Sequence, residues 1–209
     1  MKAIVFLCSL AGGLWFLMFS PWGIDDKFFW PMMMFSTGVL GVCALGIDRK
    51  RLGEVYFFRR RHVLIGVLFA GVLYFVFSAG NFLSMHIFSF AGSQVADVYS
   101  TRSSGRLAVI GLMLFLWIGP LEEVFWRGFV QRRLAERFGD WRGYLLACGI
   151  YTLVHIFSFN LMLIAAAGVC GVFWGWMFKR FKSVWPGLIS HALWDVLIFV
   201  IFPVEHGMS

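Results

Sequence analysis

The chain has 209 residues, of which 60% are hydrophobic and only 14% are charged. A soluble domain is normally about a quarter charged, so a single core surrounded by water is excluded. The net charge of +7 lies in short stretches between apolar runs, without a basic face or a recognition motif, so nucleic acid is excluded as a partner. The apolar runs are long enough to predict helices that cross a lipid bilayer.

The first half of the chain predicts three membrane-spanning helices, at about residues 3–22, 28–47 and 62–90. The first has a long apolar run and no clear small-residue cleavage site, so we expect a retained helix and not a signal peptide. A basic loop, residues 48–61, separates the second helix from the third. The third is long enough to be tilted, or broken near Gly80 and Asn81. Residues 91–105 are polar and predict a loop.

The second half predicts four further spans, one beginning at Arg106 and the others at about residues 143–159, 161–178 and 186–204. Pro120 lies inside the first of these and lacks a backbone donor, which predicts a kink or a helix restart. Residues 128–142 are amphipathic and basic. Pro186 opens the last span, where its missing N–H costs nothing.

The basic residues predict how these helices are oriented. With the amino terminus in the cytoplasm, 15 of the 18 Lys and Arg residues fall in segments on that side, as the positive-inside rule requires. The predicted fold class is therefore an all-α, polytopic membrane protein of about seven transmembrane helices with a cytoplasmic amino terminus. We expect one transmembrane domain over residues 1–209, with a motif-bearing core at about 106–204.

Six ionisable side chains lie within or beside the late apolar runs: Glu122, Glu123, Arg127, His155, His191 and Asp195. Ionisable groups at bilayer depth cost at least about 2.5 kcal/mol each, which makes them functional candidates. Glu123 and Arg127 are four residues apart, so they share a helix face and predict a structural ion pair. Glu122 is rotated by about 100° from Glu123 and points elsewhere. It needs a second partner or a proton, because one arginine does not neutralise two carboxylates.

The remaining candidates come from two later helices. His191 and Asp195 are four residues apart and share a face, whereas His155 stands alone and by itself is typical of a hydrogen-bonded core residue. We expect Tyr151, one turn before His155, mainly to pack. Together the helices supply carboxylates and imidazoles, which a hydrolytic site needs to activate water and to stabilise an oxyanion. Counting about 1.5 Å per residue places His191 nearer the cytoplasm than His155, so the two meet only if a proline or helix tilt shifts the register.

Three motifs carry a resemblance to a known family: Glu122-Glu123-xxx-Arg127, Tyr151-xxx-His155 and His191-xxx-Asp195. Their order, their spacing and their placement in successive apolar helices resemble the CPBP family, which includes type 2 CAAX prenyl proteases and bacteriocin-processing relatives. The resemblance covers about residues 107–202. It implies a glutamic-type intramembrane endopeptidase.

The resemblance also implies a role for each site residue. Glu122 and His155 would activate the attacking water, His191 and Asp195 would hold the oxyanion, and the ion pair would support the site. The family commonly has Asn where this chain has Asp195, and an ionised Asp can only accept hydrogen bonds. Either Asp195 is protonated or it orients His191. We hypothesise the second, with His191 donating to the oxyanion and Asp195 fixing its ring.

The resemblance further implies a membrane-anchored protein or peptide substrate, cleaved at a carboxyl-terminal sorting signal or a CAAX-like end. The short chain is similar to bacterial myxosortase-like members, which predicts a multi-pass protein of a bacterial cell membrane. We expect no cofactor and no metal, and the sequence does not indicate an oligomeric state. Two alternatives stay open: a zinc-dependent membrane protease, since two His and a carboxylate suit zinc, and a non-enzymatic bacteriocin-immunity or scaffold protein.

Overall fold

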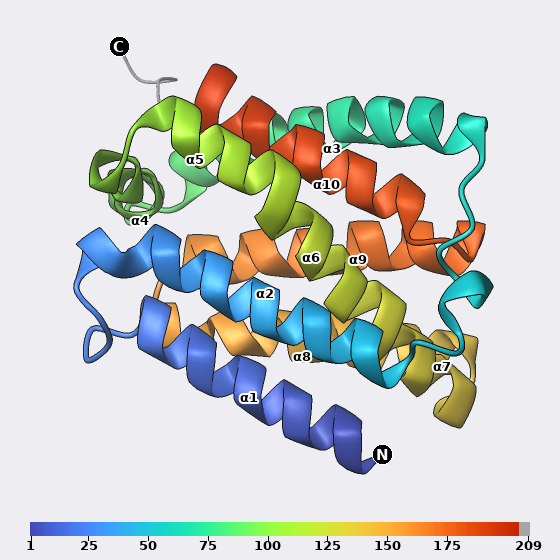
Figure 1. The fold of residues 1–209 in the computed structure, drawn as a ribbon. Coiled ribbons are helices and arrows are strands. Elements are labelled where there is room, and N and C mark those ends of the chain that lie inside the picture. Colours follow the sequence, from blue (N-terminus) through green and yellow to red (C-terminus); the bar gives the residue numbers. More distant parts are fainter. Residues whose placement is uncertain (205–209) are drawn as a thin grey trace.

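The computed structural model describes residues 1–204, which form helices joined by short connections and contain no strand (Figure 1). Five helical segments are long and apolar enough to cross a membrane: α1 (Lys2–Phe19), α2 (Phe29–Ile47) with the 3₁₀ turn Asp26–Phe28 before it, α3 (Arg60–Ile87), the joined segment Leu107–Phe138, and α9 (Leu161–Phe181). The chain is an all-α, polytopic membrane protein, as the sequence predicts.

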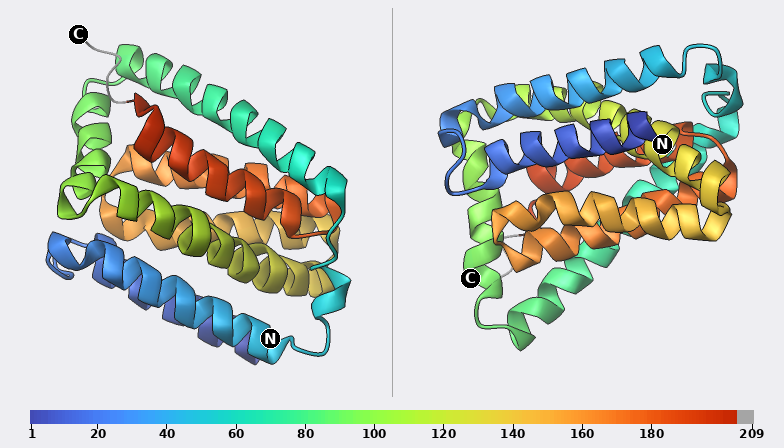
Figure 2. Two further views of the ribbon diagram at one scale, coloured as in Figure 1. Left: turned by 45° about the horizontal axis from the view of Figure 1, so that its top comes forward. Right: turned by 90° about the horizontal axis from the view of Figure 1, so that it is seen from below.

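Two shorter segments occupy the positions of the fifth and seventh predicted spans. The first is α8 (Asp140–Leu153), which continues as the 3₁₀ turn η6 (Val154–Ser158). The second is α10 (Trp185–Val196), which continues as a π-helical segment, Leu197–Ile201. Both run alongside the longer helices of the bundle (Figure 2). α8 packs against α9, and α10 packs against α3.

Residues 91–105, expected to be a loop, are mostly helical. α4 (Ala91–Ser100) and the 3₁₀ turn Thr101–Ser104 lie across one end of the bundle (Figure 2). Ala91 and Tyr99 are buried, and the Tyr99 hydroxyl donates to the carbonyl oxygen of Ile198 at 2.8 Å. These buried residues are few and lie in a segment of polar composition. Composition alone therefore predicts a loop where the chain forms a helix. By contrast, α3 runs through Gly80 and Asn81 without a break.

The segment Leu107–Phe138 is a single rod with two changes of helical register. It comprises α5 (Leu107–Met113), a π-helical stretch Leu114–Ile118, α6 (Gly119–Glu123), a second π-helical stretch Val124–Gln131, and α7 (Arg132–Phe138). The backbone N–H of Gly119 bonds to the carbonyl of Leu114, five residues back. The wider π register directly precedes Pro120, so the disturbance expected there is absorbed without breaking the rod.

Large apolar side chains cover much of the outside of the bundle, while several charged side chains of the later helices are buried within it. In the most apolar 18-residue stretch of α3, only 17% is buried inside the protein. Large exposed side chains include Phe75 and Phe6, at 73% and 67% of their full surface. A soluble monomer does not expose so much apolar area, whereas a lipid-facing surface does. The buried polar groups must therefore find partners within the protein.

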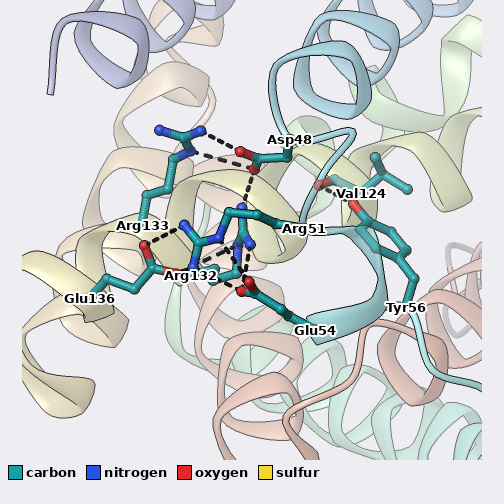
Figure 3. A network of polar contacts seen from close by, with 8 residues as sticks. All are labelled: Asp48, Arg51, Glu54, Tyr56, Val124, Arg132, Arg133 and Glu136. Carbon is teal, nitrogen blue, oxygen red and sulfur yellow. Dashed lines mark hydrogen bonds and ion pairs between the residues drawn. The ribbon is translucent and has the colours of Figure 1, made fainter.

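An ion-pair network closes the end of the bundle that holds the loop between α2 and α3 (Figure 3). It joins six side chains: Asp48, Arg51, Glu54, Arg132, Arg133 and Glu136. Arg51 contacts Glu54 at 2.8 Å and Glu136 at 2.7 Å, while Asp48 accepts from Arg132. The hydrogen bond from Arg51 lowers the pKa of Glu54. The network ties the loop to the end of the long rod.

The same loop fixes where α10 begins. The backbone N–H of Val184 donates to the carbonyl of Val55 at 2.9 Å, and the Trp185 indole donates to the carbonyl of Tyr56 at 2.8 Å. Val184 is buried, so α10 starts inside the protein and not at its surface.

Candidate active site

The six ionisable side chains singled out from the sequence are all buried, with no more than 8% of the surface of any residue exposed. They come from three parts of the fold: the long rod supplies Glu122, Glu123 and Arg127, the turn η6 supplies His155, and α10 supplies His191 and Asp195. The structure brings them into two groups, one around Glu123 and one around Glu122.

Glu123 is the acceptor at the centre of the first group. Its Oε1 lies 3.0 Å from Nη1 of Arg127, so the ion pair expected from their spacing is present. The same oxygen accepts a hydrogen bond from Nδ1 of His191 at 3.0 Å. The other oxygen, Oε2, has no hydrogen-bond partner among the described residues and faces Gly187. A Cβ on Gly187 would lie 2.8 Å from that oxygen, so only glycine lets α10 approach this closely.

The ring of His191 is held on three sides. It stacks on Trp174 of α9, with centroids 3.7 Å apart and planes 19° apart. Nδ1 of His191 donates a hydrogen bond to Glu123, and Nε2 lies 3.6 Å from Oδ2 of Asp195. The sequence assigned the fixing of this ring to Asp195, but the shorter contact, and the hydrogen bond, is to Glu123. Trp174 has no charged neighbour in the sequence to mark it, so it was not among the candidates.

Arg127 lies between the two groups. Its Nη2 donates to the carbonyl oxygen of Cys170 at 3.3 Å. Its guanidinium lies over the rings of Tyr151 and Trp174, at 4.7 and 5.6 Å from their centroids. Cation–π contacts of this kind add to the pairing with Glu123 when the charge is shielded from water. Arg127 thus contacts Glu123, Cys170 and two aromatic rings, and among the described residues its ion-pair partner is Glu123.

The second group is built on Tyr151. Its hydroxyl donates to Oε2 of Glu122 at 3.2 Å, and its carbonyl oxygen accepts from Nδ1 of His155 at 2.8 Å. Tyr151 thus links Glu122 to His155, which do not hydrogen-bond each other in the described part of the chain. This residue was expected mainly to pack, and the structure gives it a polar role as well.

His155 has a further partner that the sequence did not reveal. The indole N–H of Trp15, from α1, donates to Nε2 of His155 at 3.2 Å. Trp15 has no exposed surface. The chain has ten tryptophans, and no local pattern separates this interior one from those that face lipid.

Within residues 1–204, no group of three or more His, Cys, Asp and Glu side chains is arranged to hold a metal ion. The four cysteines are free and form no disulfide. Among the described residues, the side chains that a zinc-dependent protease would need as ligands thus do not form a ligand set.

Comparison with protein families finds a match in the second half of the chain. A family model described as "Type II CAAX prenyl endopeptidase Rce1-like" matches residues 104–197. This region is similar to the Rce1-like family. No curated protein and no solved structure matches the chain.

The Rce1-like region contains all six candidate side chains and confirms the family that the three motifs indicate. The similarity supports a CAAX-type intramembrane endopeptidase, whose substrate is a membrane-associated protein. Trp15 lies outside the Rce1-like region, on a helix that the family model does not cover.

Proposed function

We propose that this protein is a glutamic-type intramembrane endopeptidase in which Glu122, together with His155, activates a water molecule against a peptide bond of a membrane-anchored substrate. The observation that carries the proposal is the unequal engagement of the two adjacent carboxylates. Among the described residues, Glu123 is bound to a guanidinium and an imidazole, whereas the hydrogen-bond partner of Glu122 is a single neutral hydroxyl, that of Tyr151. Glu122 therefore keeps lone pairs with which to accept a proton from water.

The proposed reaction is a hydrolysis with a general base. Glu122 takes a proton from water as the oxygen attacks the carbonyl carbon of the substrate. The carbonyl oxygen then carries the negative charge of the tetrahedral intermediate. When the C–N bond breaks, the proton returns from Glu122 to the leaving amine. The water oxygen ends in the new carboxylate, and the site is restored.

His191 is placed to serve the oxyanion in this scheme. Because Nδ1 of His191 donates to Glu123, the ring is already oriented without help from Asp195. Its Nε2 lies 3.6 Å from Asp195, too far for a strong hydrogen bond. Because Nδ1 already holds a hydrogen, Nε2 can donate to an oxyanion only when His191 is an imidazolium with a hydrogen on both nitrogens, and the proposal requires that state beside the Glu123 carboxylate. An ionised Asp195 would repel an oxyanion bound at Nε2. The geometry therefore favours a protonated Asp195, the first of the two alternatives that the sequence leaves open, which donates beside His191.

The charged loops indicate which end of the bundle faces the cytoplasm. Lys182 pairs with Asp140 at 2.6 Å and Lys179 lies over Trp141, so the α9–α10 connection meets the start of α8. Arg51 joins the α2–α3 loop to α7. Three basic segments thus lie at one end of the bundle, which supports a cytoplasmic position for that end and for the amino terminus.

The proposal is tested with purified protein in lipid nanodiscs. Two peptide substrates are used: one with a prenylated CAAX-like end, and one with a transmembrane tail followed by basic residues. Cleavage is followed by mass spectrometry in H₂¹⁸O, and one ¹⁸O is expected in the new carboxyl terminus. The matched variants are Glu122→Gln and His155→Gln.

We expect wild-type protein to cleave one of the two peptides, and both variants to be inactive at equal expression and folding. Cleavage that persists in Glu122→Gln would rule out this carboxylate as the base. Activity lost on chelation and restored by zinc would instead support the metalloprotease alternative. If neither peptide is cut, comparison of protein termini in host membranes, between wild type and Glu122→Gln, decides whether the chain is a protease.

A further inference from the structure

Both ring nitrogens of His155 are occupied by groups with fixed hydrogen-bonding roles. The carbonyl oxygen of Tyr151, 2.8 Å from Nδ1, can only accept, so Nδ1 carries the hydrogen. The indole nitrogen of Trp15, 3.2 Å from Nε2, can only donate, so Nε2 carries the lone pair. The two contacts are compatible with a single state of the ring, the neutral imidazole with its hydrogen on Nδ1.

This state has one consequence for catalysis. A neutral imidazole has one lone pair in the ring plane, and here that lone pair faces the indole N–H of Trp15. Water cannot hydrogen-bond to Nε2 while the indole N–H is there. His155 can therefore help to activate water only after the hydrogen bond from Trp15 is broken.

Trp15 is held in place by packing. Its ring meets Trp126 edge to face, with centroids 6.2 Å apart, and meets His155 at 6.1 Å. Along the same helix, Phe16 and Phe19 contact Phe157 and His155. These contacts are aromatic. In the described part of the chain, the bond from Trp15 is the single side-chain hydrogen bond between α1 and η6.

The contacts of α1 with the rest of the protein allow it to shift relative to η6. It packs chiefly on η6 and on α2, and it lies beside the Rce1-like region without belonging to it (Figure 1). No ion pair ties α1 to its neighbours in the described residues. An aromatic interface can slide or rotate at a lower cost than a buried ion pair, which must stay matched.

We propose that Trp15 is a gate residue of the active site: in the free protein its indole caps the base nitrogen of His155, and substrate binding displaces it so that water can enter. This inference rests on the proposed function, because it needs His155 to act on water. The resting enzyme is then protected from idle hydrolysis, and its activity is coupled to the arrival of a substrate beside α1.

The first test is Trp15→Phe, which keeps an aromatic ring and removes the N–H. With the peptide that wild type cleaves, we expect kcat to rise about two- to tenfold, the factor set by the loss of one hydrogen bond. The matched control is Trp126→Phe, which shortens a neighbouring indole whose nitrogen has no hydrogen-bond partner among the described residues. This control should not raise kcat. An unchanged or reduced kcat in a folded Trp15→Phe protein overturns the gate.

The second test reads the gate without catalysis. In protein labelled with ¹⁵N at tryptophan, the Trp15 indole N–H signal should lie downfield and move upfield in His155→Phe. It should move the same way when the cleaved peptide is added to Glu122→Gln protein, which binds without turnover. If the Trp15 signal stays unchanged in both experiments, the gate proposal is wrong. Cleavage by the wild-type protein would still support the proposed function in that case. Wild-type protein that cleaves no substrate removes the proposed function itself.

Discussion

Glu122 and Glu123 are neighbours in sequence and both are buried, yet their surroundings differ. Glu123 meets Arg127 and His191 with one oxygen, and its other oxygen packs on Gly187. In the part of the chain that the structure describes, Glu122 accepts a hydrogen bond from the hydroxyl of Tyr151 alone. A helix turns by about 100° per residue, so two adjacent carboxylates can face different helices. Burial is therefore common to the two carboxylates, and what distinguishes them is how many of their lone pairs accept hydrogen bonds from the protein.

The largest expected effect separates the two carboxylates by activity. Glu122→Gln keeps the shape and can still accept from Tyr151, but the amide cannot take a proton from water. We expect cleavage to fall by about 10²–10⁴-fold, the usual contribution of a general base. The free energy of unfolding, followed by titration with denaturing detergent, should stay close to wild type. A large loss of stability would show that Glu122 is a structural group like its neighbour.

The next largest effect distinguishes Glu123 from Glu122 by its contribution to the free energy of unfolding. Arg127→Met removes the charge that offsets Glu123 and leaves a buried carboxylate with only His191. We expect the free energy of unfolding to fall by about 3–5 kcal/mol, the range found when one partner of a buried pair is removed. The same detergent titration measures this loss.

The double variant Glu123→Gln/Arg127→Met is the control for that result. It removes both charges, so most of the lost stability should return even though the ion pair is gone. If the double variant is less stable than Arg127→Met alone, the cost does not come from an unpaired charge, and the role assigned to Glu123 is incorrect.

Much of this site could be anticipated from spacing. The i, i+4 relation gave the Glu123–Arg127 pair, and the three motifs gave the family. What the sequence could not give depends on contacts between distant segments. The hydrogen bond of Glu123 to His191 joins two helices 68 positions apart, and that of Trp15 to His155 spans 140. No local rule reports such contacts.

The fold shows the same limit. Hydropathy located the long apolar helices because each is recognisable by itself. It missed α4, whose helical state depends on burying Ala91 and Tyr99 against other elements. Nor does it report that the start of α10 is held by a backbone hydrogen bond from Val184 to Val55 in the α2–α3 loop. Tertiary contacts decide both features.

A smaller effect sharpens the role of Asp195. If its carboxyl donates to the oxyanion, Asp195→Asn retains a donor, and we expect activity within about tenfold of wild type. Asp195→Ala removes the donor and should lose substantially more. As pH rises, wild-type activity should fall once Asp195 loses its proton, whereas the Asn variant should not follow that decline. If both variants lose activity equally, a negative charge is required there, and Asp195 orients His191 as the sequence alone indicated.

The smallest effect concerns a charged cluster of a different kind, the network around Arg51. The hydrogen bond from Arg51 lowers the pKa of Glu54, so the contribution of Glu54 to stability is present above its ordinary value of 4.5 and is lost as pH falls through the folded-state value. Glu54→Gln should therefore destabilise slightly at neutral pH and not at strongly acidic pH. High salt should also remove this difference in stability, since exposed ion pairs are screened.

The Glu123–Arg127 pair should be insensitive to the same salt, because it is buried away from water. Equal salt sensitivity of the two pairs would mean that water reaches Glu123, and the contrast between its engaged carboxylate and the available Glu122 would no longer hold.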